Sequence, residues 1–176
     1  MKKFCISLAI ILIICVSAAA LSGTGKDKAR NEEYLRIHIR ANSNDEKDQS
    51  VKMLIKELVV DYMTDLVLSA KDKSDLIVKI KNAVPSINAL IDGFLEEKGF
   101  NYKAQTIINN EFFPTRFYKD LTLTEGFYDA VIIKLGKAEG DNWWCVVYPP
   151  LCFTEQKNVR YRSLIAEYIN RIKEKR

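Results

Sequence analysis

The chain of 176 residues contains few side chains that could make or break a covalent bond. His38 is its one histidine, and Cys145 and Cys152 are two of its four cysteines. A cysteine acts as a nucleophile when a base lies within hydrogen-bond distance of its sulfur. A thiol hydrolase would therefore need Cys145 or Cys152 beside His38, and such a secreted hydrolase is one alternative function.

Metal and phosphate chemistry is not predicted. The single histidine and the two cysteines lack the paired C-x-x-C or H-x-x-x-H spacing of zinc sites. Glycines at 136 and 140 flank a turn between two expected strands, and a phosphate-binding loop would instead join a strand to a helix. We expect no catalytic residue, no metal and no cofactor.

Three acidic residues, Asp45, Glu46 and Asp48, could supply the carboxylate pair of a glycosidase. They also fall at an expected helix start, where the positive end of the helix dipole favours acidic side chains without any catalytic role. A carboxylate hydrolase acting at the cell wall is thus the second form of the enzymatic alternative.

Residues 1–22 have the pattern of an export signal. Two lysines precede an apolar run over residues 4–16, and small residues suited to cleavage follow at 17–20. The apolar stretch also approaches the length of a membrane span, so a signal peptide or an uncleaved signal anchor is predicted. Export would place Cys145 and Cys152 in an oxidising compartment, where a disulfide between them is the first expectation.

Residues 142–152 concentrate both tryptophans, two cysteines and two prolines. Proline donates no hydrogen bond to a sheet, so Pro149 and Pro150 are predicted to turn the chain and return Cys152 toward Cys145. Closing a loop of about eight residues would stabilise the fold by roughly 2.5 kcal/mol.

This segment has two interpretations. It is either a structural staple with its tryptophans in the core, or a rigid recognition surface for a partner protein. Because successive strand residues point to opposite faces, one tryptophan could be core and the other surface. The candidate partner-binding residues are Trp143, Trp144, Tyr148, Pro149 and Pro150.

The first expected element is a half-buried strand over residues 34–40, where apolar and polar side chains alternate. Its inward side chains would be Leu35, Ile37 and Ile39, and its polar face Arg36, His38 and Arg40. Ser43 and Glu46 then have the spacing of a capping box for a helix that runs to about Leu68.

A second helix is expected after Asp72 or Ser74. Pro85 should interrupt it, because proline lacks the backbone donor that a helix interior requires, and a third helix would end at Gly99. Strand-like stretches follow at residues 102–108, 111–118, 127–135 and 142–148, with a turn at 109–110. Short connections between them suggest antiparallel neighbours.

Helices in one block and strands mostly in another indicate an α+β domain. We expect an N-terminal strand, a helical block, a mostly antiparallel sheet of about four further strands with helices on one face, and a C-terminal amphipathic helix. The predicted organisation is a leader (1–22), a linker (23–32), a single domain (33–154) and a basic C-terminal helix (155–176). That basic tail suits an anionic membrane surface or an acidic protein patch, and nucleic acid is not an expected partner.

Several blocks resemble the stage II sporulation protein R family. They are LRIHIRANS at 35–43 with DQ at 48–49, FPT at 113–115, GFYDA at 126–130 and GDNWWCVVYPPLCF at 140–153. The chain departs from the family pattern at Lys119 and at Thr124 and Glu125, all three in turns.

The resemblance implies a protein made in the forespore and exported into the space between the forespore and mother-cell membranes. There it would activate a membrane-embedded aspartic protease, which cleaves the precursor of sporulation sigma factor E. It implies no catalytic residues. A structural domain tethered at the septum is a further alternative.

Overall fold

The computed structural model describes residues 31–118 and 121–153. The predicted leader (1–22) and C-terminal helix (155–176) lie outside these residues. The elements, in chain order, are β1 (Leu35–Arg40), α2 (Glu46–Leu68), α3 (Lys73–Glu97), β2 (Ala104–Phe113), β3 (Arg116–Tyr118), β4 (Leu121–Leu123), β5 (Gly126–Leu135) and β6 (Asn142–Tyr148).

The chain divides into two compact units. The described part of the larger unit comprises residues 34–111 and 129–153, and that of the smaller unit residues 31–33, 112–118 and 121–128. Strands β2 and β5 contribute residues to both units, and the smaller unit also contains the two-stranded sheet β3–β4.

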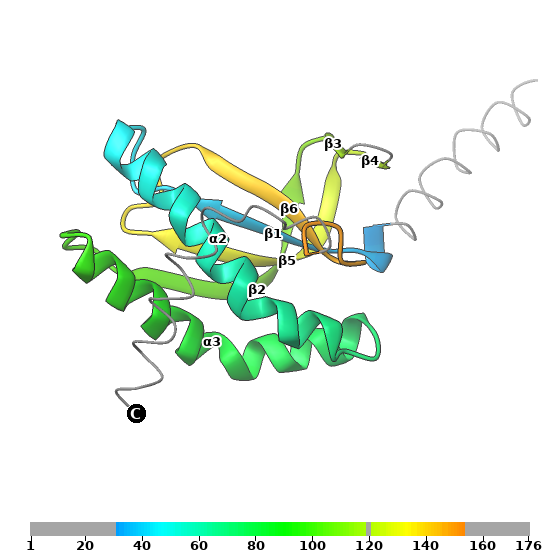
Figure 1. Ribbon diagram of the computed structural model, residues 1–176. Helices are drawn as coiled ribbons and strands as arrows, with labels where there is room; N and C mark the ends of the chain where they lie inside the picture. Colours follow the sequence, from blue (N-terminus) through cyan, green and yellow to red (C-terminus); the bar gives the residue numbers. More distant parts are fainter. Residues whose placement is uncertain (1–30, 119–120, 154–176) are drawn as a thin grey trace, which may run out of the picture. The chain divides into compact units, whose positions relative to one another are not determined.

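A four-stranded sheet in the order β2-β5-β1-β6 forms the frame of the larger unit. Strand β1 pairs in parallel with β5 and antiparallel with β6. Helix α2 packs beside α3 and contacts β1 and β6, so the two helices lie on one side of the sheet (Figure 1). The predicted α+β class, with helices on one face of a mostly antiparallel sheet, is confirmed.

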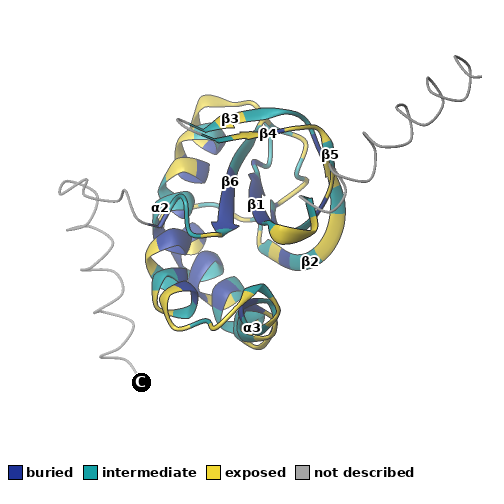
Figure 2. Ribbon diagram, turned by 90° about the vertical axis from the view of Figure 1, so that its right-hand side faces the viewer, coloured by how far each residue is buried: buried dark blue, intermediate teal, exposed yellow. Residues whose placement is uncertain are grey.

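The core lies between the helices and the sheet. Buried segments coincide with β1, β6 and the inward sides of the helices (Figure 2). Apolar side chains at helical spacing on α2 supply one layer, and the inward residues of β1 and β5 supply the other. These residues include Val51, Ile55, Leu58, Ile37, Ile39, Val131 and Ile133.

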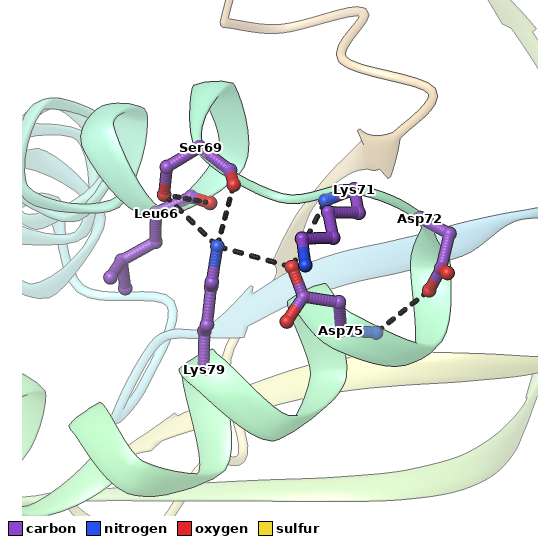
Figure 3. A network of polar contacts seen from close by, with 6 residues as sticks. All are labelled: Leu66, Ser69, Lys71, Asp72, Asp75 and Lys79. Atoms are coloured by element: carbon purple, nitrogen blue, oxygen red, sulfur yellow. Dashed lines mark hydrogen bonds and ion pairs between the residues drawn. The ribbon is translucent and has the colours of Figure 1, made fainter.

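The connection between the two helices is fixed by polar contacts (Figure 3). Asp72 caps α3, because its side chain accepts a hydrogen bond of 2.8 Å from the backbone N–H of Asp75. Lys79 reaches back to the carbonyl oxygen of Ser69 at 2.6 Å and to the Asp75 carboxylate at 3.1 Å. The predicted helix start at Asp72 is confirmed.

The prediction that Pro85 breaks the helix is wrong, since α3 is continuous through it. Pro85 lies on the exposed side of α3, where water can bond the carbonyl that loses its partner. Ile80 and Ile87 are fully buried before and after it, and their packing holds both halves in line. The predicted cap at Gly99 is confirmed. Gly99 has φ +80°, and Phe100 N–H donates to the carbonyl oxygen of Leu95 at 2.9 Å.

The capping box predicted at Ser43 and Glu46 is also wrong. The residue before α2 is Asp45, whose side chain makes no capping hydrogen bond, and the Ser43 hydroxyl accepts from Asp45 N–H at 3.1 Å. Ser43 lies two residues before the N-cap position of Asp45, so its hydroxyl orders the preceding turn instead.

Two strand predictions need correction. The turn expected at 109–110 lies inside β2, an edge strand whose exposed positions tolerate asparagine. Strands β5 and β6 are joined by a short connection but do not pair, because β1 lies between them. The free edge of β2 is covered by α3, where Asp92 and Asn88 accept hydrogen bonds of 2.7 and 2.9 Å from the N–H groups of Ala104 and Thr106.

Candidate functional site

The end of β6 carries the predicted disulfide. Cys145 and Cys152 are joined, with their Cα atoms 6.4 Å apart, within the ordinary range for such a bridge. Beyond Tyr148 the chain turns at the prolines, and Leu151 N–H donates to the carbonyl oxygen of Pro149 at 2.8 Å. We call residues 148–152 the stapled turn. The bridge ties this turn to the edge strand β6.

The two tryptophans of β6 point to opposite faces of the sheet, as strand alternation predicts. Trp143 pairs with Ile39 and lies on the helix side, with Lys56 Nζ 5.8 Å from its ring centroid. Trp144 pairs with His38, and the centroids of their rings are 4.7 Å apart. Both tryptophans are half-buried, so neither is a fully buried core residue or a fully exposed surface residue.

Every candidate partner-binding residue keeps some accessible surface. Pro149 is exposed, and Tyr148 and Pro150 are half-buried like the two tryptophans. Because Trp143 and Trp144 face opposite sides of the sheet, a partner on one side could contact only one of the two together with the turn. Their role in binding stays a prediction.

The arrangement required for a thiol hydrolase is not formed. Both candidate thiols are in the disulfide, so neither can become a thiolate. Cys145 pairs with Ile37, whereas His38 is the next residue along β1 and points to the other face of the sheet. The imidazole and the sulfur therefore lie on opposite sides of the strand.

The face of β1 predicted to be solvated is buried. Arg36 and His38 are fully buried, because β1 is a central strand and its second face is covered as well. His38 Nε2 lies 3.1 Å from Glu111 Oε2, and Arg40 forms an ion pair with the other oxygen of Glu111. We call His38, Arg40 and Glu111 the histidine cluster. A carboxylate only accepts hydrogen bonds, so Nε2 carries the proton.

Burial lowers the pKa of His38 to about 4, against the opposing attraction of Glu111 and with a further lowering from Arg40. The imidazole is thus neutral near pH 7. It acts there as a hydrogen-bond donor to Glu111 and as a flat surface against Trp144. Sequence reasoning missed Glu111, which lies 73 positions along the chain from His38.

A second polar cluster surrounds Asp48 at the start of α2. The Asp48 carboxylate accepts hydrogen bonds of 2.7 Å from each of three side chains, Asn42, Ser43 and Tyr102. We call these four residues the aspartate knot. Burial alone would raise the pKa of Asp48, but the three hydrogen bonds outweigh it and lower the pKa below its ordinary value. Burial and the contact with Asp48 raise the pKa of Tyr102.

The loop between β5 and β6 is bound to the loop between β1 and α2. Asn44 Oδ1 accepts from Asp141 N–H at 2.7 Å, and the buried Lys52 donates to the Asp141 carbonyl oxygen at 2.9 Å. A Cβ atom on Gly140 would collide with the carbonyl oxygen of Ser43, so only glycine allows this approach. Two blocks of the family pattern, at 35–49 and 140–153, therefore meet in space.

The acidic residues considered for glycoside hydrolysis do not form a catalytic pair. Asp45 and Glu46 are exposed, whereas the Asp48 carboxylate is occupied by three hydrogen bonds inside the aspartate knot. Across residues 31–118 and 121–153, no group of three or more His, Cys, Asp or Glu side chains is arranged to hold a metal ion. In the same ranges, none of the helices has the length and apolar character needed to cross a membrane.

These features define a small α+β domain with a disulfide-stapled edge strand and two buried polar clusters. The model of the family described as stage II sporulation protein R matches residues 31–158. The stage II sporulation protein R of Bacillus subtilis (strain 168) is 32% identical over 158 residues, covering 84% of this chain and 70% of that protein. No solved structure matches the chain significantly. The chain belongs to the stage II sporulation protein R family, and this membership supports a role in sporulation.

Proposed function

We propose that this chain is an exported signalling protein of the forespore that activates a membrane-embedded aspartic protease of the mother cell. The activated protease would then process the precursor of sporulation sigma factor E. The observation that carries the proposal is the family match over residues 31–158, which covers all the described elements. Activation by binding requires only that the chain have a higher affinity for the active state of the protease than for its inactive state.

The Cys145–Cys152 disulfide supports the exported location. Disulfides persist in oxidising compartments and are rare in the cytosol, where thiols are kept reduced. The bridge therefore agrees with the export signal predicted over residues 1–22. The space between the forespore and mother-cell membranes is the compartment that the proposal assigns.

The use of the polar side chains supports a binding role over a hydrolytic one. His38 contacts Glu111 and Trp144, Asp48 binds three side chains of its own fold, and both candidate nucleophiles are in a disulfide. His38, Asp48 and both candidate nucleophiles are therefore held by structural contacts.

The test is to express the full chain together with the protease and the precursor in a bacterium that does not sporulate. Export-competent chain is expected to produce cleaved precursor, and a chain lacking residues 1–21 is not. Disulfide formation, read by alkylation of free thiols, checks that the first form was exported and the second was not. Absence of cleavage with exported, oxidised chain would overturn the proposal.

A further inference from the structure

The disulfide of the larger unit spans an irregular part of the sheet. Strand β6 pairs residue by residue with β1 as far as Val146, but the register shifts before the next pair, which involves Tyr148. Val147 is therefore an extra residue in the ladder, and a bulge of this kind interrupts strand pairing. The stapled turn begins directly beyond the interruption.

Hydrogen bonds of the sheet cannot hold the stapled turn at its prolines. Pro149 and Pro150 have no N–H group to donate to a neighbouring strand. The bond from Leu151 N–H to the Pro149 carbonyl oxygen lies within the turn itself. The disulfide joins Cys152, which follows the prolines, to Cys145, which lies in the regular part of the ladder. The bridge thus ties the turn to the sheet across the bulge.

The bridge closes a short loop that contains three of the five candidate partner-binding residues, Tyr148, Pro149 and Pro150. Its two cysteines are seven positions apart, so opening it frees only a local segment. Strand β6 would keep its pairs with β1 up to Val146, and the loop before β6 would stay bound to the loop before α2. The state of the two sulfurs therefore controls the shape of this surface and leaves the rest of the unit folded.

We propose that the Cys145–Cys152 disulfide is a redox switch of the signal. The chain is folded but inactive while both thiols are reduced, and it becomes active when they are oxidised after export. Cytosolic thiols are kept reduced, so the switch would keep the chain silent in the compartment where it is made. This inference rests on the proposed function, because export supplies the change of compartment and protease activation supplies the readout.

Closing the switch requires an oxidant that carries a disulfide, such as a thiol oxidoreductase or oxidised glutathione. Cys145 is 1% exposed, whereas Cys152 is half-buried and is the sulfur that an oxidant reaches first. The Cys152 thiolate attacks one oxidant sulfur and expels the other as a thiolate. The Cys145 thiolate then attacks the Cys152 sulfur of this mixed disulfide and expels the remaining oxidant sulfur. The two electrons and two protons that the chain loses convert the oxidant to two thiols.

The test measures activity and folding on the same samples. Purified full-length chain is equilibrated in glutathione buffers that range from oxidising to reducing and is then added to membranes containing the protease and the precursor. Alkylation of free thiols gives the bridged fraction, and tryptophan fluorescence with the thermal midpoint reports the fold. Cys145→Ser with Cys152→Ser cannot form the bridge. Cys5→Ser with Cys15→Ser is the matched control, because it removes two cysteines and keeps the bridge.

We expect cleavage by the wild type to fall at least tenfold as the bridge opens, while the fluorescence stays native. Oxidised glutathione should then restore it. The variant without Cys145 and Cys152 should have the same low activity in every buffer, and the variant without Cys5 and Cys15 should follow the wild type. A bridge-free variant that does not respond to the buffer also shows that the buffer does not act on the protease.

The contradicting outcomes are distinct from one another. Unchanged activity of folded, reduced chain would overturn the switch and leave the proposed function standing. Activity that is lost only together with the native fluorescence would show a bridge needed for folding alone, and would also overturn the switch. Should the serine variant fail to fold, the glutathione series on the wild type decides. No cleavage by the oxidised wild type would overturn the proposed function and the switch with it.

Discussion

His38 is the residue whose environment departs furthest from what its neighbours along the chain suggest. It lies between two arginines on a strand with an alternating pattern, which predicts a solvated side chain. Its partners are Glu111 and Trp144, and no local pattern connects His38 to residues so distant in sequence. The burial of His38 therefore depends on the strand order, which only the folded chain displays.

The pKa of about 4 makes the stability of the protein depend on pH. The unfolded chain binds a proton near pH 6.5, whereas folded His38 resists protonation until about pH 4, so stability is lost as pH falls through this window. We expect the loss to approach 1.4 kcal/mol per pH unit near the middle of that window, where His38 is protonated in the unfolded chain and neutral in the folded one. Urea unfolding between pH 7 and pH 5 would measure it.

His38→Gln is the matched variant, because glutamine keeps a donor for Glu111 and does not titrate. Its free energy of unfolding should fall less steeply between pH 7 and pH 5 than that of the wild type, whatever its absolute stability. Parallel pH profiles for the two proteins would contradict the neutral, buried imidazole.

Asp48 has a structural role that its place in the sequence does not indicate. Acidic residues are common at helix starts, but the Asp48 carboxylate accepts hydrogen bonds from three side chains. Asp48→Ala would leave the hydroxyl of Tyr102, the amide of Asn42 and the hydroxyl of Ser43 without their acceptor. We expect a loss of about 2–4 kcal/mol in unfolding free energy, measured in urea. Asp45→Ala, at an exposed residue without a capping bond, should change it by less than about 0.5 kcal/mol. Equal effects would contradict the aspartate knot.

At the scale of elements, the sequence predicts the helix ends and caps, because these depend on residues close by along the chain. Helix α2 has the expected end at Leu68, and both Asp72 and Gly99 occupy the expected positions at the ends of α3. Each of these depends on periodicity or on a cap within a few residues. The effect of Pro85 depends instead on which side of α3 faces water, which neighbouring residues along the chain do not determine.

Strand order could not be predicted in the same way. A short connection between β5 and β6 favours pairing of these two strands, but β1 inserts between them and pairs with both. That choice depends on contacts between residues about 90 to 110 positions apart along the chain. The predicted disulfide was accessible from sequence because Cys145 and Cys152 are only seven positions apart.

The disulfide stabilises the edge strand to which the stapled turn is attached. Replacing both Cys145 and Cys152 by alanine should reduce the unfolding free energy by about 2.5 kcal/mol, the chain-entropy value for a loop of this size. Chemical reduction of the wild type provides a control with unchanged side-chain volume. A double variant as stable as the oxidised wild type would show that the bridge adds nothing to stability.

At the scale of the whole molecule, two blocks of family residues far apart in sequence converge at the loops beside α2. Asn44 and Lys52, which follow the stretches 35–43 and 48–49 of the first block, bind Asp141 of the second block, and Gly140 allows the two loops to approach closely. These contacts stabilise the packing of the two loops. The stapled turn in the larger unit keeps accessible surface that a partner could contact.

The central claim is that this chain triggers precursor cleavage by binding the protease and not by cutting the precursor itself. The most direct measurement adds purified, oxidised full-length chain to membranes that contain the protease and the precursor. Our account predicts cleavage that rises with the chain and saturates, and none when the catalytic aspartates of the protease are replaced by alanine. Cleavage that persists with the inactive protease would contradict the account, as would no cleavage with the active one.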